Sequence, residues 1–167
     1  AAAMATASQL SPGNSQQSEE GVGGSKEVVV AVWRAVLALV VERKADALID
    51  CGALMSGATP AEAAAILIHE LDPDPEKGFQ GVVYFDTDLE QWAVLDRLGR
   101  RLPKHKSPIR DRDAFAYFDE SRCRGADLKL RHDAAAIVTV GPGMCKDKLM
   151  QAAGRMRMLG RSQTLAF

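Results

Sequence analysis

The sequence predicts a single α/β domain in which helices cover both faces of a parallel sheet, giving three layers, preceded by a disordered tail. Helix-like and strand-like segments alternate along the chain, and the strand-like segments are almost continuous apolar runs. Such runs are typical of parallel strands that are buried on both faces. The length of 167 residues, with 47% hydrophobic and 26% charged residues, suits one globular domain and excludes a wholly disordered chain.

The tail is predicted from its composition. Residues 1–26 are mostly Ala, Ser, Gln, Gly and Thr and contain no aromatic residue, so they can bury too little apolar surface to offset the entropy of ordering. The domain then covers residues 27–167. Its first segment, from Glu27 to Lys44, has the length of a helix, although Val28–Val30 could open it as a strand.

The clearest local signal is a helix start at residues 59–62, Thr-Pro-Ala-Glu. It combines an N-cap, a proline at the first helical position and the glutamate of a capping box, and the predicted helix runs to Leu71. Before it, the short apolar run 47–54 predicts a buried strand. After it, residues 72–75 predict a loop, because each of two prolines biases the preceding residue away from helix.

The rest of the domain continues the alternation. We expect strands at 81–85, 114–118, 135–140 and 163–167, helices at 88–100 and 146–158, and a basic loop at 101–112.

Charge is distributed unevenly between the two halves of the domain. Residues 46–96 carry eleven acidic residues and one basic residue, whereas residues 97–167 carry sixteen basic and seven acidic residues. The basic half suits a phosphate-bearing partner, either a nucleotide or a nucleic acid. The alternative is that the two halves neutralise each other in the fold. Residues 97–112 contain no aromatic side chain on which a base could stack, so nucleic-acid binding has weak support.

Cysteine and histidine usage indicates an intracellular protein, cytoplasmic or nuclear. The three cysteines are too few and too scattered for a disulfide framework, and the histidines lack metal-ligand spacing. The start of the chain lacks the pattern of a signal peptide, and the apolar run 28–41 is shorter than a membrane span, so we expect no membrane partner. The residues concerned are Cys51, Cys123, Cys145, His69, His105 and His132.

A complete ATPase would need a phosphate-binding loop, and this chain does not supply one. The one similar stretch, Gly21–Lys26, has the wrong spacing and no strand before it, so we expect no cofactor in this chain. The loops after the strands at 114–118 and 135–140 should face the ligand crevice of the sheet. Beyond them, Arg155 and Arg157 could act on a phosphoryl group in trans as arginine fingers, or could be solvated surface charges.

Two segments resemble the second RecA-like lobe of superfamily-2 helicases. Residues 119–127 fit the spacing of the fifth helicase motif, and Gly81–Asp86 looks like the fourth. Gln151, Gly154 and Arg155 match the sixth motif, Gln-x-x-Gly-Arg-x-x-Arg, while Arg157 arrives one residue early. The resemblance implies a RecA-like fold, and ATP with magnesium in the parent protein. The nucleotide-sensing residues that it implies are Arg124, Gly125, Asp127, Gln151, Arg155 and Arg157.

A closer resemblance covers about residues 46–167. The segments LIDCGALMSG, GVVYFD, YFDESRCRGADLKL and AAIVTVGPGMCKDKLMQAAGRMRMLGRSQ resemble the C-terminal part of a family of very large eukaryotic proteins grouped with the ubiquitin thioesterases, or ubiquitinyl hydrolases. The chain departs from relatives at Ser121–Cys123, where they show Ala-His-Thr, and at Arg131, where they show Pro. The resemblance implies a thiol-protease parent that acts in deubiquitination and ubiquitin-dependent proteolysis. Its partners would be ubiquitin and the parent's other domains.

Cys123 is the candidate nucleophile within this chain. It lies between Arg122 and Arg124, whose charges should lower the pKa of its thiol, and His132 is a candidate base. The threonine of relatives at this position argues against the role, and Cys51 in its apolar run reads as an inert buried thiol. Two functions stay open. The chain is either a non-catalytic helicase-lobe-like module of a ubiquitinyl hydrolase, or the second lobe of an ATP-dependent remodelling helicase that supplies arginine fingers.

Overall fold

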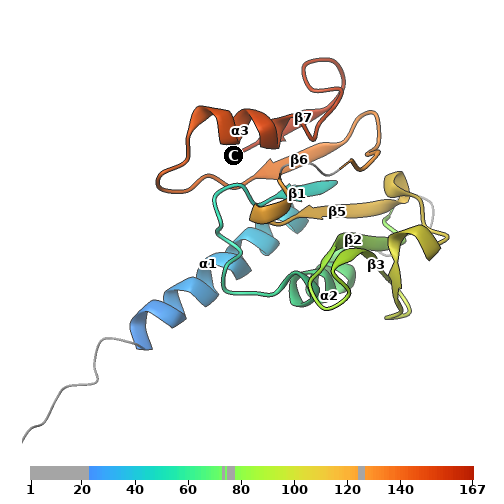
Figure 1. The fold of residues 1–167 in the computed structure, drawn as a ribbon, viewed down its shortest axis with the longest axis horizontal. Coiled ribbons are helices and arrows are strands. Elements are labelled where there is room, and N and C mark those ends of the chain that lie inside the picture. The colour runs from blue at the N-terminus through green and yellow to red at the C-terminus, as the bar shows by residue number, and fades with distance from the viewer. Residues whose placement is uncertain (1–22, 73, 75–77, 124–126) are drawn as a thin grey trace, which may run out of the picture.

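The computed structural model describes residues 23–72, 74, 78–123 and 127–167, with side chains from residue 32 onward. Within them the chain forms one seven-stranded mixed sheet flanked by helices (Figure 1). The predicted α/β class, a mostly parallel sheet between helices, is confirmed. The strands are β1 (Ala47–Ile49), β2 (Gly81–Asp86), β3 (Gln91–Asp96), β4 (Arg101–Pro103), β5 (Ala114–Phe118), β6 (Ala135–Val138) and β7 (Thr164–Ala166).

The strand order across the sheet is β4-β3-β2-β5-β1-β6-β7. The pairs β2–β5, β5–β1, β1–β6 and β6–β7 are parallel, whereas β2–β3 and β3–β4 form an antiparallel meander at one edge. β1 lies at the centre of the parallel part, where Ala47 pairs with Ala116 on one side and Ala136 on the other. All three of its residues are buried, which explains its continuous apolar sequence.

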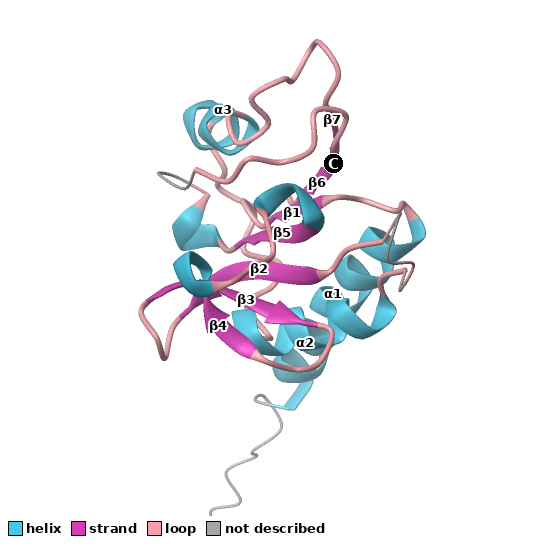
Figure 2. Cartoon of the chain, turned by 90° about the vertical axis from the view of Figure 1, so that its right-hand side faces the viewer, coloured by secondary structure: helices cyan, strands magenta, loops and turns pink. Residues whose placement is uncertain are grey.

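Helices cover the two faces of the sheet. α1 (Gly23–Glu42) and α2 (Pro60–Glu70) pack on one face around Leu37, Val40 and Leu67. α3 (Lys146–Ala153) covers the other face, where Ala152 contributes to a second apolar cluster. In Figure 2, α1 lies to the right of the strands and α3 to the left. The expectation that both faces are covered therefore holds.

The start of α2 is determined by residues next to it in the sequence, whereas its end is stabilised by a residue farther along the chain. At its start, the Thr59 hydroxyl accepts from the Glu62 N–H at 3.2 Å, and the Glu62 carboxylate accepts from the Thr59 N–H at 2.8 Å. This is the predicted capping box. At its end, the guanidinium of Arg97 donates to the carbonyl oxygens of Ile68 at 2.9 Å and Leu71 at 3.2 Å, and also to that of Asp72. A fourth bond, at 2.7 Å, reaches the carbonyl of Phe79 just before β2.

The predicted helix at 88–100 is wrong. The chain turns at residues 87–90 and returns as β3, paired antiparallel with β2. Asp86, buried at the end of β2, accepts hydrogen bonds from the N–H groups of Asp88 and Leu89, both at 3.0 Å, and so closes the turn. Glu90 completes it with a positive φ of 51°. The apolar residues of β3 then pack across the hairpin, with the Trp92 ring 6.0 Å from that of Phe85.

Other boundaries also differ from the prediction. The basic loop at 101–112 contains β4 and two short 3-10 helices, Lys104–Lys106 and Asp111–Asp113. The strand predicted at 47–54 ends at Ile49, and the helix predicted at 146–158 ends at Ala153.

The described part of the chain begins with a helix. α1 begins at Gly23, so the expected boundary between residues 26 and 27 falls inside a helix, and Val28–Val30 are helical. The prediction of a disordered tail falls, for residues 1–22, outside the described part of the chain.

Candidate functional site

The carboxyl ends of the parallel strands form the place where the fold positions a ligand site. The chain leaves β1 toward β2 on one side of the sheet and leaves β5 toward β6 on the other, so the connections diverge above β1 and β5. Ligands of open α/β sheets bind in the crevice at such a point. Here a cavity of about 230 Å³, which we call the edge cavity, is lined by residues that follow β1, β2 and β5. Its polar lining includes Asp50, Thr87, Tyr117, Asp119, Glu120 and Arg122.

Asp50 is the centre of the hydrogen bonding at this edge. It directly follows β1 and is 3% exposed. Its carboxylate accepts from the Thr139 hydroxyl at 2.5 Å and from the N–H groups of Leu54 at 2.9 Å and Met55 at 3.1 Å. Burial raises the pKa of Asp50, and these hydrogen bonds counter part of that effect. The carboxylate therefore joins the ends of β1 and β6 and shapes the loop that follows β1.

The loops after β1 and β6 also touch through their backbones. A Cβ atom at Gly52 would lie 2.7 Å from the nitrogen of Gly141, and one at Gly141 would lie 2.5 Å from the carbonyl oxygen of Gly52. Only glycine allows this approach. The Gly52 N–H donates to the Thr139 hydroxyl at 2.9 Å, so the same threonine holds both loops.

The thiols of Cys51 and Cys123 lie behind the cavity, inside the second apolar cluster. The Cys123 thiol donates to the carbonyl of Asp119 at 3.2 Å, and that of Cys51 to the carbonyl of Lys148 at 3.6 Å. The two thiols lie close enough for each to influence the pKa of the other. Burial raises the pKa of both, that of Cys123 to about 12. The expectation that arginine neighbours lower the pKa of Cys123 is therefore wrong, because the thiol points into the core.

The structure does not bring a base to Cys123. His132 precedes β6 and so lies at the amino edge of the sheet, whereas Cys123 follows β5 at the carboxyl edge. The His132 side chain is 81% exposed and lies 3.6 Å from Asp133. His69 is in the last turn of α2 and His105 is in a 3-10 helix. Among the described residues no group of three or more histidine, cysteine or acidic side chains is arranged to hold a metal ion.

Arg122 and Glu120 are held firmly beside the cavity. The Arg122 guanidinium lies 3.7 Å from the centre of the Phe85 ring, a cation–π contact that holds it against β2. Glu120 accepts from the Lys148 ammonium at 2.6 Å, which fixes α3 against the loop after β5. That hydrogen bond raises the pKa of Lys148.

The residues of the helicase resemblance gather on the same side of the molecule as α3. Arg157 donates to Asp127 at 2.8 Å, an exposed ion pair that joins the segment after β5 to the turn after α3. Arg155 is half-buried, with its Nε atom enclosed, while Gln151 is exposed on α3. The predicted residues Arg124 and Gly125 lie outside the described part of the chain.

Sequence reasoning did not single out Asp50, Thr139 or Lys148, and it placed Glu120 in a helicase-like motif without predicting its partner. Asp50 and Thr139 could have been identified from the sequence, since each is the first polar residue after an apolar strand. No local sequence pattern identifies the Glu120–Lys148 pair. Taken together, the carboxylates, hydroxyls and fixed arginine suit the binding of a polar group, and the inward thiols do not suit covalent catalysis.

The opposite charges of the two halves meet in the fold. Three arginines of the basic half bind acidic residues of the other half, and Arg131 also lies 4.7 Å from the centre of the Phe79 ring. This favours the alternative of mutual neutralisation over a free basic surface. The pairs are Arg100–Asp96, Arg101–Asp86 and Arg131–Asp46.

No protein-family model, curated protein or solved structure matches this chain. Within the described residues, none of the helices combines the length and apolar character needed to cross a membrane.

Proposed function

We propose that this chain is a non-catalytic, helicase-lobe-like module of a larger intracellular protein of the ubiquitinyl hydrolase class. The resemblance over residues 46–167 suggests the class. The module would act by holding other domains of the parent, or ubiquitin, in the arrangement that cleavage needs.

The supporting observation is the coupling of the two motif-bearing segments. Glu120 binds Lys148 at 2.6 Å and Asp127 binds Arg157 at 2.8 Å, so two ion pairs connect the segment after β5 to α3 and the turn beyond it. In a second RecA-like lobe these are the segments that sense the partner lobe. The pairing supports a preserved lobe architecture in which the segments move as one unit.

The inward thiols support the non-catalytic part of the proposal. A cysteine nucleophile reacts as the thiolate and needs a base within hydrogen-bond reach. Cys123 is 1% exposed, its pKa is raised to about 12, and His132 lies at the other edge of the sheet. The third cysteine, Cys145, is exposed at the N-cap of α3.

The test uses a ubiquitin–fluorophore conjugate with the chain and with the full-length parent. We expect no cleavage by the chain, and cleavage by the parent that falls when Asp127→Lys or Arg157→Glu reverses one charge of the pair. The double reversal should restore much of the parent's rate, because the ion pair is re-formed with opposite signs. Cleavage by the chain that disappears in Cys123→Ala would contradict the proposal, as would a parent rate that none of the reversals changes.

The second candidate is an ATP-dependent remodelling helicase in which this lobe supplies an arginine finger. Its support is Arg155, whose half-buried side chain and enclosed Nε atom are typical of a positioned guanidinium rather than a solvated one. Bound ATP with magnesium would supply the phosphoryl group, and its phosphates would have to be held by another lobe. In this chain Arg155 is a better candidate than Arg157 for contacting those phosphates, because Arg157 already binds Asp127.

This candidate is tested with Arg155→Lys in the full-length protein. Lysine keeps the charge but loses the planar fork, and loss of an arginine finger lowers the rate by on the order of 10³ or more. Arg161→Lys is the matched control, since Arg161 is exposed. ATP turnover within about twofold of the control would exclude the finger role, because a finger contributes far more than that.

A further inference from the structure

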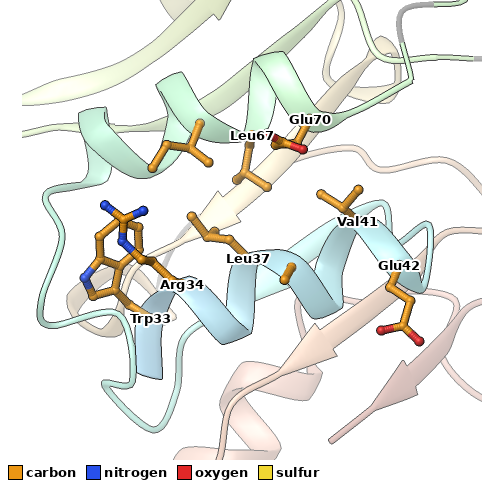
Figure 3. A pocket seen from close by; sticks show the side chains of 9 residues that line it. Trp33, Arg34, Leu37, Val41, Glu42, Leu67 and Glu70 are labelled. Carbon is orange, nitrogen blue, oxygen red and sulfur yellow. The ribbon is translucent and has the colours of Figure 1, made fainter. Parts of the chain in front are cut away.

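A groove between α1 and α2 lies on the face of the sheet opposite α3. It has a volume of about 570 Å³ and an apolar floor formed by Leu37 and Val41 of α1 and Ile66 and Leu67 of α2. Figure 3 shows Leu37 and Val41 of α1 facing Leu67 of α2 across the gap between the two helices. Leu37 and Leu67 are deeply buried, whereas Val41 and Ile66 are partly exposed to solvent.

The two ends of the groove carry opposite charges. Arg34 lies at one end, where its guanidinium is 4.9 Å from the centre of the Trp33 ring. Glu42 and Glu70 lie toward the other end, on α1 and α2 respectively (Figure 3). Within the described residues none of these three charged groups has an ion-pair partner. The groove therefore presents a positive end, an apolar floor and a negative end.

We infer that this groove binds an amphipathic helix of a partner protein, with an acidic first turn beside Arg34 and a basic last turn beside Glu42 and Glu70. That charge order is the one that a helix itself prefers, since acidic groups are favourable at its N-terminus and basic groups at its C-terminus. The bound helix then runs in the same direction as α1. Arg34 and Glu42 are about 12 Å apart along α1 at 1.5 Å per residue, which is about eight residues of a bound helix. A helix of roughly 12–15 residues therefore spans this distance and places its first and last turns beside the charged ends.

The chain's own segments do not fit this description. The sequence before α1 offers only Met4, Leu10 and Val22 as large apolar residues, too few for an i, i+3, i+4, i+7 stripe. α3 of a second copy has exposed Met150, but its first turn carries Lys146 and Lys148 beside Asp147 and its last turn has no basic residue, so it lacks the charge order that the groove requires. The inference is independent of the proposed function, because the groove and the edge cavity share no lining residue.

The test is a titration of the chain with a fluorescent 15-residue helical peptide that has leucines at i, i+3, i+4 and i+7, glutamates in its first turn and lysines in its last. A second peptide carries glutamine at the charged positions. We expect the charged peptide to bind about five- to tenfold more tightly than the glutamine peptide at low salt. Glu42→Lys with Glu70→Lys should remove that difference and leave the affinity of the glutamine peptide within about twofold.

A matched pair of variants locates the binding surface. Ala38 lines the groove and Ala35 does not, although both are exposed on α1. Ala38→Glu should weaken binding by about tenfold or more because it places a charge on the apolar floor, whereas Ala35→Glu should change it by about twofold or less. A nitroxide at the peptide's N-terminus should broaden the amide signals near Arg34 rather than those near Glu70.

Several outcomes would overturn the inference. These are no binding of either peptide at millimolar concentration, equal effects of the Ala38 and Ala35 variants, or broadening near Glu70. Dimerisation of the chain alone that Ala38→Glu abolishes would also overturn it, since the occupant would then be a second copy.

Discussion

Arg97 fastens the C-terminal end of α2 to the entrance of β2, and its replacement should be among the most damaging single changes outside the apolar core. Its guanidinium donates four hydrogen bonds to backbone carbonyls, three at the end of α2 and one at Phe79. Arg97 thus satisfies the carbonyls of Ile68 and Leu71, which lie where a helix leaves its last carbonyls without partners. Its positive charge at the C-terminus of the helix also complements the helix dipole. The side chain is half-buried, so solvent replaces only some of these bonds when it is removed.

The magnitude follows from these four bonds. A hydrogen bond from a charged donor contributes about 1.5–3 kcal/mol, but neighbouring bonds are not additive and the exposed carbonyl of Asp72 regains water. We therefore expect Arg97→Met to lower the free energy of unfolding by about 3 kcal/mol. Arg97→Lys should lose about 2 kcal/mol, because one ammonium group cannot reach carbonyls that the planar fork spans.

The measurement is urea unfolding followed by far-ultraviolet circular dichroism. Arg161→Met is the control, since Arg161 is exposed and should change stability by less than about 0.5 kcal/mol. If Arg97→Lys unfolds at the same urea concentration as the wild type, the fork geometry is not what stabilises this junction and the reasoning fails. If Arg97→Met matches the control, the four hydrogen bonds contribute nothing measurable.

Three further predictions concern single sites. Cys145 is the N-cap of α3 but makes no side-chain capping bond, so Cys145→Thr should raise the free energy of unfolding by about 0.5–1 kcal/mol, and an unchanged thermal midpoint would contradict this. Burial alone would raise the pKa of Asp86, but its hydrogen bonds and Arg101 hold that pKa below the usual 3.8. The stabilisation that ionised Asp86 provides is therefore fully present above pH 3.8 and is lost as the pH falls through the lowered pKa. Asp86→Asn should accordingly flatten the decline of the urea midpoint below about pH 5. An equally steep decline in the variant would refute the assignment. Finally, native protein treated with iodoacetamide should be modified at Cys145 alone, and at Cys51 and Cys123 only after unfolding, as peptide mass spectrometry would show; rapid labelling of Cys123 in the native state would contradict its burial.

Local signals in the sequence predicted α2 well because its start depends on residues 59–62 alone. The hairpin of β2 and β3 was missed for the opposite reason. The apolar residues of 91–98 fit a helix as well as a strand, and the choice depends on pairing with β2, of which Phe85 against Trp92 is one contact. The carboxylate of Asp86, which closes the turn, was the local clue.

The candidate site, too, could be predicted only where it depends on local sequence. That polar residues follow the parallel strands could be predicted, and they do meet at one edge of the sheet. The environment of Cys123 could not, because its sequence neighbours are arginines whereas its spatial neighbours are Cys51 and the carbonyl of Asp119. The bond between Asp50 and Thr139 joins residues 89 positions apart, a separation that no local pattern encodes.

The place of β1 at the centre of the sheet has a consequence for how the molecule assembles. This three-residue strand has no neighbour in sequence among its partners, since it pairs only with β5 and β6, which come much later in the chain. The meander of β2, β3 and β4, in contrast, closes over short turns and can form early. Because non-local pairing must wait for long loops to close, we expect slow, late insertion of β1 between β5 and β6 to limit the rate of folding. On the ribosome, β1 would remain without either partner until β5 has emerged.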